Sequence, residues 1–400
     1  MALFVKVVPK VFKNENRDVR ELSTVKELGL DIIVVAKGES KENKSVEGFD
    51  VHCMDTRPFG DCKFIVKLNR IMSLLSWAWY IKKLKPDMIS GHDLVGLLIG
   101  WMATCFIRKK KKALLIYDSH EFELGRFRNN KKSIFYTKII RIIESFLLKR
   151  ASLIIMVNDS IADEVKKIYG LSNKPLVVRN IPDVTLHEDE LKEQEVHAFI
   201  SKWEIPSDCF KVMYHGGVIA GRGIENLIKA IIDDKDLYLI VLGNGEAEYI
   251  GELKHMAKEV GVEERVRFID AVPMDQLIKA IKVADVGMIT IPNMSKSYYF
   301  MLPNKLFENI QAQTPIIGSD FPEIKKIVEE YKIGICCNPH DVIQIRQSIE
   351  RMKNDSSLHR EFKCNMNIAK KELCWENEKK KLKLAYEKLY NTNLNREFNN

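Results

Sequence analysis

Short apolar runs alternate with longer amphipathic segments along most of this chain. Residues 5–8 and 32–36 are β-branched runs, and the segment 18–28 between them has apolar positions at helical spacing and ends at Gly29. Such runs are typical of buried parallel strands, and glycine suits the position after a helix C-terminus. The chain is therefore predicted to begin with a β-α-β unit.

The same alternation continues to residue 178 and resumes near residue 210. Further strands are predicted at 86–89, 114–117, 153–157 and 176–178, and then at 211–214, 237–242, 266–269, 285–291, 315–318 and 333–336. Most of the stretches between them have helical spacing, and strands that alternate with helices build parallel sheets. The pattern predicts an α/β protein with two doubly wound, Rossmann-like domains.

A polar, acidic stretch at 187–195 separates the two series of strands. A polar composition without apolar periodicity is typical of a linker. The predicted organisation is an N-terminal domain at 1–184, an acidic linker at 185–207, a second domain at 208–375, and a charged helix with a tail at 376–400.

The composition fits a two-domain protein. The 400 residues are 46% apolar and 30% charged, which is typical of a globular chain long enough to form two cores. Eight cysteines occur without a C-x-x-C pair or a zinc-like histidine spacing, so we expect reduced thiols and no metal site. The segment 1–12 is too short and charged for a signal peptide, which favours a cytoplasmic protein.

The net charge of +8 is confined to the first half of the chain. Residues 1–200 contain 34 Lys and Arg against 26 Asp and Glu, whereas the remaining residues contain 29 of each. Such asymmetry is compatible with nucleic acid, an anionic membrane surface or an acidic substrate as partner. It is equally compatible with a basic surface that is only solvated.

Two segments of the first half combine apolar and basic residues. Residues 94–107 are apolar and precede the basic run Arg108–Lys112, but they are too few for a membrane span. Within 125–150, a helical apolar stripe consists of Ile139, Ile140, Ile142, Ile143, Phe146 and Leu147. A helix that faces the core is favoured here over a segment that lies on a membrane surface.

Candidate binding chemistry is concentrated in Leu302–Asp320. Pro303 suits the first position of a helix, which places Asn304, Lys305 and Glu308 near the helix N-terminus. A helix N-terminus presents free N–H groups and a partial positive charge to anions, and a carboxylate can accept hydrogen bonds from a ribose diol. The alternative is an ordinary helix–strand unit of an α/β domain.

Glycine-rich turns follow two predicted strands of the second domain. Gly216 and Gly217 follow one strand, and Gly243 and Gly245 follow the next. Glycine lets the backbone approach a ligand closely, and the forked charge of Arg222 suits phosphate oxygens. These features predict a diphosphate site. No glycine-rich fingerprint follows the first strand of the chain, which disfavours a dinucleotide-binding enzyme.

A titratable cluster at 118–121, with the sequence DSHE, follows the strand predicted at 114–117. Ligands collect outside the carboxyl ends of parallel strands, so His120 and Glu121 are candidate site residues. The alternative is a helix cap formed by Asp118 or Ser119.

Several of these segments resemble the motifs of one enzyme family. They are PNKLFEN (303–309), TPIIGSDFPEI (314–324), YHGG (214–217), GRGIENLIKA (221–230) and YDSHE (117–121). They resemble the donor-binding and acceptor-domain segments of retaining glycosyltransferases of family 4, also known as glycosyl transferases group 1. The resemblance implies a GT-B fold, with two Rossmann-like domains facing across a cleft. It also implies metal-independent transfer of a sugar from a UDP- or GDP-linked donor.

The resemblance further implies roles for single residues. Glu308 would bind the ribose within the catalytic site, while His120 and Glu121 would line the acceptor side as catalytic residues. A basic residue of Arg17–Arg20 would be exposed to the sugar or the acceptor. The remaining donor-binding residues would be Gly216, Gly217, Arg222, Gly243, Gly245, Asn304 and Lys305.

The chain departs from the family pattern at two positions. Phe300 lies eight residues before Glu308, where many members carry a second Glu that faces the sugar. Many members also carry a further basic residue near the position of Gly217. We therefore expect Lys305 to share the diphosphate charge with Arg222.

The expected function is glycosyl transfer to a glycan or lipid-linked acceptor, in the biosynthesis of a surface polysaccharide such as a capsule, or of a glycolipid. No cofactor, metal or nucleic acid is expected. An anionic membrane surface is a further expected partner, with the protein peripheral at the inner face of the membrane. Two alternatives stay open. One is a nucleotide-sugar 2-epimerase on the same fold, and the other, because of Phe300, is a non-catalytic glycosyltransferase-like partner subunit.

Overall fold

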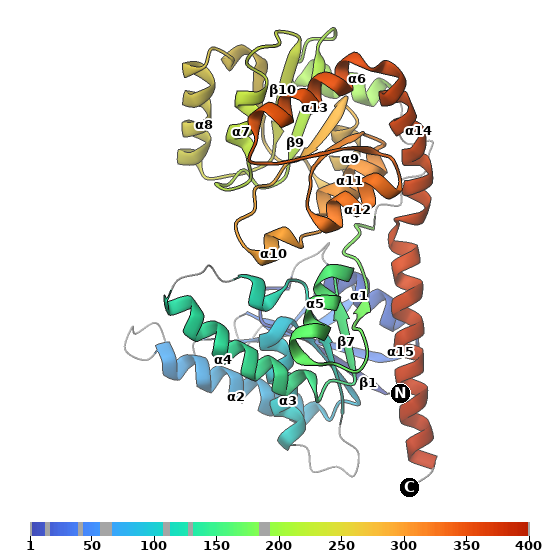
Figure 1. Cartoon of the computed structure of the whole chain (residues 1–400). Helices are drawn as coiled ribbons and strands as arrows, with labels where there is room; N and C mark the ends of the chain where they lie inside the picture. The colour runs from blue at the N-terminus through green and yellow to red at the C-terminus, as the bar shows by residue number, and fades with distance from the viewer. Residues whose placement is uncertain are drawn as a thin grey trace. The chain divides into compact units, whose positions relative to one another are not determined.

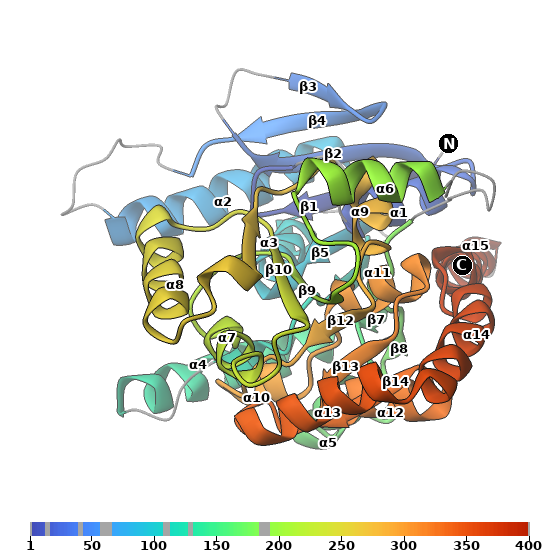
Figure 2. The same ribbon diagram turned by 90° about the horizontal axis from the view of Figure 1, so that it is seen from above.

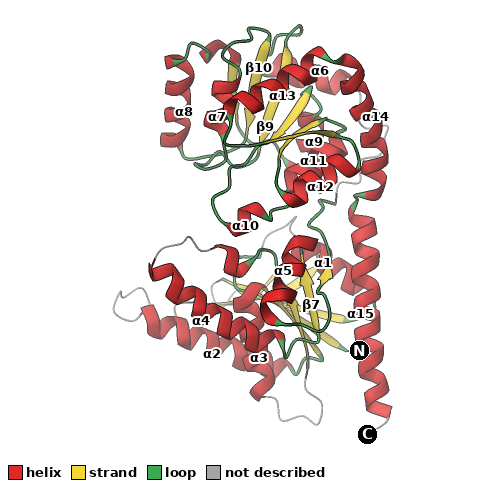
Figure 3. Cartoon of the chain, in the orientation of Figure 1, coloured by secondary structure: helices red, strands yellow, loops and turns green. Residues whose placement is uncertain are grey.

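The computed structural model describes residues 2–12, 17–38, 43–56, 66–106, 113–126, 131–183 and 193–398. The chain divides into two compact units, Met1–Asn180 with Glu376–Asn400, and Ile181–Trp375. Each unit contains one sheet with helices packed against it (Figures 1 and 3). The prediction of two α/β domains is confirmed.

The first unit contains eight strands. Its elements are β1 (Leu3–Val8), α1 (Arg17–Lys26), β2 (Asp31–Lys37), β3 (Asn43–Val46), β4 (Phe49–Met54), α2 (Val66–Leu84), β5 (Met88–His92), α3 (Asp93–Phe106), β6 (Leu114–Asp118), α4 (Lys131–Leu148), β7 (Leu153–Met156), α5 (Asp159–Tyr169), β8 (Leu176–Val177) and α15 (Trp375–Phe398).

The strand order of this sheet is β3-β4-β2-β1-β5-β6-β7-β8, and β3 and β4 are the only antiparallel pair among its described strands. Val5 of β1 pairs with Ile33 of β2 and with Ile89 of β5. From β1 the chain moves outward to β2, and from β5 it moves outward the other way. Right-handed crossovers therefore place α1 on one face of the sheet and α2, α3 and α4 on the other. Ligands bind such sheets at the carboxyl ends of the strands where the direction reverses.

The second unit contains six strands. Its elements are α6 (Glu193–Lys202), β9 (Phe210–His215), α7 (Ile224–Ala230), β10 (Leu237–Leu242), α8 (Ala247–Glu259), β11 (Val266–Ile269), α9 (Met274–Ile281), β12 (Val286–Ile289), α10 (Lys296–Tyr299), α11 (Asn304–Ala312), β13 (Ile316–Ser319), α12 (Pro322–Glu330), β14 (Gly334–Cys337), α13 (Val342–Asn354) and α14 (Ser356–Glu372).

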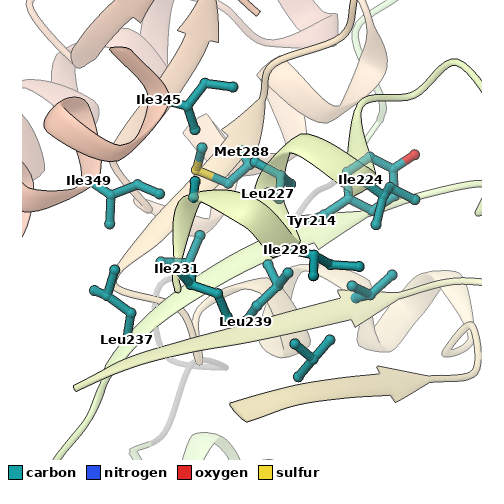
Figure 4. Packing of buried hydrophobic residues seen from close by; sticks show 14 of the residues in the cluster. Tyr214, Ile224, Leu227, Ile228, Ile231, Leu237, Leu239, Met288, Ile345 and Ile349 are labelled. Carbon is teal, nitrogen blue, oxygen red and sulfur yellow. The ribbon is translucent and has the colours of Figure 1, made fainter. Parts of the chain in front are cut away.

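All neighbouring strands of this second sheet are parallel, in the order β11-β10-β9-β12-β13-β14. The direction of winding reverses between β9 and β12, which makes the carboxyl end of β9 the expected ligand site. The core on one face contains Leu227 of α7, and Ile231 directly after this helix, packed with Leu239 of β10 and Ile349 of α13 (Figure 4). These side chains are fully buried and fix α7 directly after the β9 loop.

The predicted linker at 185–207 needs correction over 193–207. Residues Glu193–Lys202 form α6, and Trp203 and Ile205 are buried in a cluster with Ile278 of α9. The acidic residues suggested a linker, but Val196 and Ile200 are at helical spacing and give α6 an apolar face. This part of the chain therefore belongs to the second unit. Residues 184–192 lie outside the described part of the structure.

The last helix, α15, belongs to the first unit. Figure 1 shows it as the long C-terminal helix. Tyr386 is completely buried, packs edge-on against Phe4 at 5.8 Å, and donates a hydrogen bond to Glu21. The first unit is thus built from both ends of the chain.

The predicted stripe on α4 is divided between two faces of the helix, and only part of it faces the core. Ile139, Ile142 and Phe146 are 37%, 70% and 40% exposed, whereas Leu147 is buried. Periodicity predicts that a helix has an apolar face but not which of two apolar faces packs inward. The basic run Arg108–Lys112 lies outside the described residues. Within the described residues, no helix is long and apolar enough to cross a bilayer.

Candidate functional site

The loops that follow β9 and β10 in the second unit rest directly on each other. Gly216 and Gly243 adopt φ values of 115° and 149°, and a Cβ at Gly243 would lie 2.0 Å from the Gly216 carbonyl oxygen. A Cβ at Gly245 would lie 2.1 Å from the Val218 oxygen. These glycines are therefore required for the loops to pack together. Gly217 differs, because a Cβ there would meet nothing within 4 Å.

Helix α11 brings its first turn to the same side of the second unit. Pro303 precedes the helix with φ −75° and ψ 147°, one position earlier than predicted, and Asn304 is the exposed first residue. Leu306 and Phe307 are completely buried in the core. They hold the helix so that Lys305 and Glu308 are only 9% and 8% exposed.

Lys305 is a buried amine that has no carboxylate in contact within the described part of the chain. Its Nζ donates no hydrogen bond to any described residue and lies 3.8 Å from the centre of the Tyr214 ring. The same atom is 3.7 Å from the position that a Cβ at Gly216 would occupy. Burial and the nearby Arg222 charge lower the pKa of Lys305 to about 7, although Glu308 opposes the shift. A bound anion would relieve this arrangement.

Glu308 is held by a residue that was not predicted as part of the site. His215, the last residue of β9, places Nε2 2.9 Å from Glu308 Oε2, while its buried Nδ1 has no hydrogen-bond partner among the described residues. The signal was its position at the carboxyl end of the central strand. Arg222 is half-buried just before α7, with its guanidinium 5.7 Å from the Tyr298 ring centre.

The first unit gathers charged groups at the carboxyl ends of β1, β5 and β6. Lys6 of β1 is completely buried, and its Nζ lies 3.2 Å from Asp18 and 3.0 Å from Asp118 and also pairs with Glu21. Burial alone would lower the pKa of Lys6, but the three carboxylates raise it.

Arg17 belongs to this cluster rather than to the surface. Its Nη2 and Nε lie 3.0 Å and 3.1 Å from Asp118 Oδ1, and its Nη1 donates to the Val178 oxygen. Only 5% of Arg17 is exposed. Arg17 is therefore not the exposed basic residue that was expected within Arg17–Arg20. Arg20 is half-buried and donates to Asn180.

His120 lies at the rim of the buried charged cluster. Its Nε2 is 2.9 Å from Asp118 Oδ2, its backbone N–H donates to Asp93 Oδ1 at 2.9 Å, and its side chain is 17% exposed. Its ring packs on that of His92, with centroids 3.9 Å apart. Asp93 has φ 55°, a region that few residues other than glycine adopt. The structure thus fixes the orientation of His120 and leaves one edge of its ring accessible.

His92 has a carboxylate near each of its ring nitrogens. Its Nδ1 lies 2.9 Å from Asp18 Oδ1, and its Nε2 lies 3.4 Å from Asp93 Oδ2. Burial would lower the pKa of His92, but the hydrogen bonds to these carboxylates raise it to about 9. The cluster can therefore present a positive ring beside His120.

Glu121 lies apart from the buried cluster. Its carboxylate is 57% exposed and pairs with Arg126 at 2.7 Å. Arg126 in turn reaches Asp93 at 3.5 Å and so links the Glu121 carboxylate to the residues around the histidine pair.

Three side chains of the first unit offer ligand atoms of types that metals bind. Atoms of Asp18, His92 and His120 lie within 4.8 Å of one another. Imidazole nitrogen and carboxylate oxygen suit zinc and other divalent ions. These atoms are hydrogen bonded within the cluster, and Lys10 Nζ lies 3.0 Å from His92 Nε2. The expected absence of a metal stays a prediction.

The two units therefore carry separate sets of site residues. The second unit brings together the predicted Gly216, Gly217, Gly243, Gly245, Lys305 and Glu308, with Arg222 near enough to perturb Lys305. The first unit supports the predicted His120 through residues that were not predicted as site residues: Lys6, Asp18, Glu21, His92 and Asp93. His92 and Asp93 had a sequence signal, their position at the carboxyl end of β5, whereas Asp18 and Glu21 lie on α1 and Lys6 lies within β1.

Comparison with known proteins covers both units. Residues 196–367 match the family model of glycosyl transferases group 1, and residues 20–184 match that of glycosyltransferase family 4. An uncharacterized glycosyltransferase of Methanocaldococcus jannaschii is 25% identical over 76% of this chain and 78% of that protein. A D-inositol 3-phosphate glycosyltransferase of Corynebacterium glutamicum is 23% identical over 65% of this chain and 62% of that protein.

Solved structures share the fold at low sequence identity. The sucrose-phosphate synthase of Thermosynechococcus elongatus has a TM-score of 0.74 at 16% identity, over 98% of this chain and 100% of that one. The Anabaena protein HepE, in complex with UDP, also has a TM-score of 0.74, at 14% identity and over 97% and 100% of the two chains. Because the two family models together match both α/β units, and the fold is shared with these proteins, the chain belongs to the group 1 glycosyltransferases of GT-B fold.

Proposed function

We propose that this protein transfers a sugar from a UDP- or GDP-linked donor to a glycan or lipid-linked acceptor, with retention of configuration and without a metal ion. The bond between the sugar and the diphosphate breaks, a glycosidic bond forms to an acceptor oxygen, and the nucleoside diphosphate leaves. The product would be a surface polysaccharide or a glycolipid. In this proposal the second unit binds the donor and the first unit binds the acceptor.

The unpaired Lys305 Nζ is the observation that carries the donor assignment. A buried ammonium without a partner is costly, and a diphosphate would supply the missing negative charge. Arg222 and the backbone N–H groups at the start of α11 would share this load. Glu308, oriented by His215, would accept hydrogen bonds from the two ribose hydroxyls.

Uridine donors are the first to test. HepE has been solved in complex with UDP and in complex with UDP-glucose, and its fold matches this chain. A calorimetric comparison of UDP-glucose with other UDP- and GDP-linked sugars would identify the preferred donor. The same titration with a chelator present tests metal independence, since the affinity should stay unchanged.

The decisive variants are Glu308→Ala and Arg222→Ala. Each removes a charge-assisted contact to the donor, so each should weaken UDP-glucose binding by roughly 1.5–3 kcal/mol. Glu252→Ala, an exposed glutamate of α8, is the matched control and should bind like wild type. Wild-type affinity in both folded site variants would exclude this donor site.

Phe300 leaves a non-catalytic partner subunit as the second candidate. It follows α10, and its ring lies 5.6 Å from that of Tyr299. A phenylalanine at this position cannot supply the carboxylate that many family members have there. A subunit of this kind would bind nucleotide weakly or not at all. The 2-epimerase alternative predicts free epimerised sugar in a reaction without acceptor, whereas a transferase requires the acceptor.

A further inference from the structure

Helix α4 has a second apolar face, opposite the one that packs on the sheet. Glu144, Leu147 and Leu148 are buried and define the inner face. The outer face consists of Phe135, Ile139, Ile142 and Phe146, which are 64%, 37%, 70% and 40% exposed. Their spacing of four, three and four residues places all four on one line along the helix.

Helix α2 repeats this arrangement. Trp77 and Ile81 are buried against the sheet side, and Ser73 lies with them. The outward line consists of Leu68, Ile71, Leu75 and Trp79, which are 48%, 58%, 37% and 53% exposed. Large aromatic and aliphatic side chains in continuous exposed lines are unusual on a protein surface and mark an interaction site.

The two outward lines belong to one surface. Helices α2, α3 and α4 cover the same face of the first sheet, and α3 lies between the other two (Figures 1 and 2). Trp101 of α3 packs edge-on against Phe146 of α4, with centroids 5.0 Å apart. We call the eight outward residues of α2 and α4 the α2–α4 surface.

The exposed charged residues described on α2, on α4 and in the turn that follows α4 are all positive. The exposed cations are Arg70, Lys83, Lys138, Arg141, Lys149 and Arg150. The sequence of α2 contains no Asp or Glu, and the only one in α4, Glu144, is buried. Lys83 Nζ lies 3.3 Å from the Trp79 ring centre, and the Arg150 guanidinium lies 3.5 Å from that of Phe146.

We propose that the α2–α4 surface docks on an anionic lipid bilayer. The apolar lines would enter the boundary between headgroups and acyl chains, while the lysines and arginines would contact lipid phosphates. A second copy of this chain fits less well, because two such surfaces would bring like charges together without a carboxylate from either α2 or α4. This inference rests on the proposed function, because it concerns the acceptor. A lipid-linked acceptor lies at a bilayer, and this surface would bring the first unit to it.

The test is vesicle sedimentation of the full chain, without donor or acceptor. Vesicles of phosphatidylcholine mixed with phosphatidylglycerol should bind the protein, and vesicles of phosphatidylcholine alone should not. Binding should be lost between about 0.1 M and about 1 M salt, where the Debye length falls from about 10 Å to about 3 Å.

Two pairs of substitutions separate charge from apolar insertion. Lys138→Glu with Lys149→Glu, and Phe135→Ser with Ile142→Ser, should each lower the vesicle partition coefficient by about tenfold or more. The matched controls lie in the second unit: Lys254→Glu with Lys258→Glu, and Ile343→Ser with Ile368→Ser. These control residues are also exposed, and both control pairs should sediment like wild type.

Three outcomes would overturn the proposal: negligible binding to anionic vesicles at low salt, equal loss of binding in the controls, and dimerisation without lipid that the Phe135→Ser, Ile142→Ser pair abolishes. The last would assign the surface to a second copy. Calorimetry with UDP-glucose is run on the same proteins. A protein that binds vesicles but no nucleotide-sugar would contradict the proposed function and leave this inference standing.

Discussion

Donor binding should change the charge state of the Lys305 amine. Burial lowers its pKa to about 7, with Arg222 acting in the same direction, and a bound diphosphate would raise that pKa again. Below pH 7 the amine is already charged. Above pH 7 the donor must bind together with a proton, so affinity for UDP-glucose should fall by up to about tenfold per pH unit.

Calorimetry at several pH values, in two buffers of different ionisation enthalpy, measures both the affinity and the proton taken up. Lys305→Met should bind weakly at every pH and take up no proton, whereas Lys254→Met, at an exposed position of α8, should behave like wild type. A wild-type affinity that is flat from pH 6 to pH 8 would sink this account of Lys305.

Glu144 makes the stability of the first unit depend on pH. Burial raises its pKa from 4.5 to about 7, although hydrogen bonds from Tyr169 and Tyr117 oppose the shift. The folded unit therefore holds a proton on Glu144 that the unfolded chain releases between pH 4.5 and pH 7. As the pH rises through this window, the free energy of unfolding should fall by up to about 1.4 kcal/mol for each pH unit.

Glu144→Gln removes this pH dependence. The free energy of unfolding of the variant, relative to wild type, should increase by up to about 3 kcal/mol between pH 4.5 and pH 8. Urea denaturation at the two pH values measures the difference, with Glu252→Gln as a surface control. If the difference between variant and wild type is the same at both pH values, the carboxyl is ionised in the folded protein throughout.

At the scale of elements, β5, β6 and the start of α3 together determine the orientation of His120. Asp118 binds its Nε2 and Asp93 binds its backbone N–H. We predict that His120→Ala lowers turnover on the order of a hundredfold, the typical effect of losing one positioned contact to the transition state. Donor affinity should change little, because the proposed donor-binding residues lie in the second unit. Turnover at the wild-type rate in a folded variant would leave His120 with a structural role only.

The elements themselves were largely predictable because their signals are local. Apolar runs such as 237–242 identify buried strands by composition alone, and short segments such as PNKLFEN carry several donor residues at fixed spacing. The hairpin of β3 and β4 was missed, since no strand was predicted between 36 and 86. Residues 47 and 48, with φ values of 52° and 73°, close that hairpin.

The features that escaped prediction depend on distant parts of the chain. In the sequence, Lys6 is a single charge within a strand. Only the folded structure brings Asp18, Glu21 and Asp118 around it. The pairing of His215 with Glu308 joins residues far apart in the sequence. The outer face of α4 was misjudged for a related reason, because a helix with two apolar faces does not reveal from its own sequence which face the sheet covers.

At the scale of the whole molecule, α15 stabilises the first unit through Tyr386. Its hydroxyl donates to Glu21 in the buried cluster around Lys6. Tyr386→Phe leaves that carboxylate with one donor fewer and should lower the local stability of β1 by about 1–3 kcal/mol. Hydrogen exchange of the β1 amides measures this loss.

Tyr390→Phe, at a half-buried position of the same helix, is the control. The β1 amides of this variant should exchange as slowly as those of the wild type. Equal protection in the Tyr386 variant would mean that α15 only covers the sheet.

The discontinuous first unit also dictates an order of events on the ribosome. Residues 181–375 are synthesised in full before α15 emerges. Glu21 and Phe4 therefore lack their contacts with Tyr386 while the entire second unit is being made. The second unit is contiguous and can finish folding first, which reverses the usual N-to-C order of domain folding. A stop codon that removes α15 would therefore damage the half of the protein that is translated first.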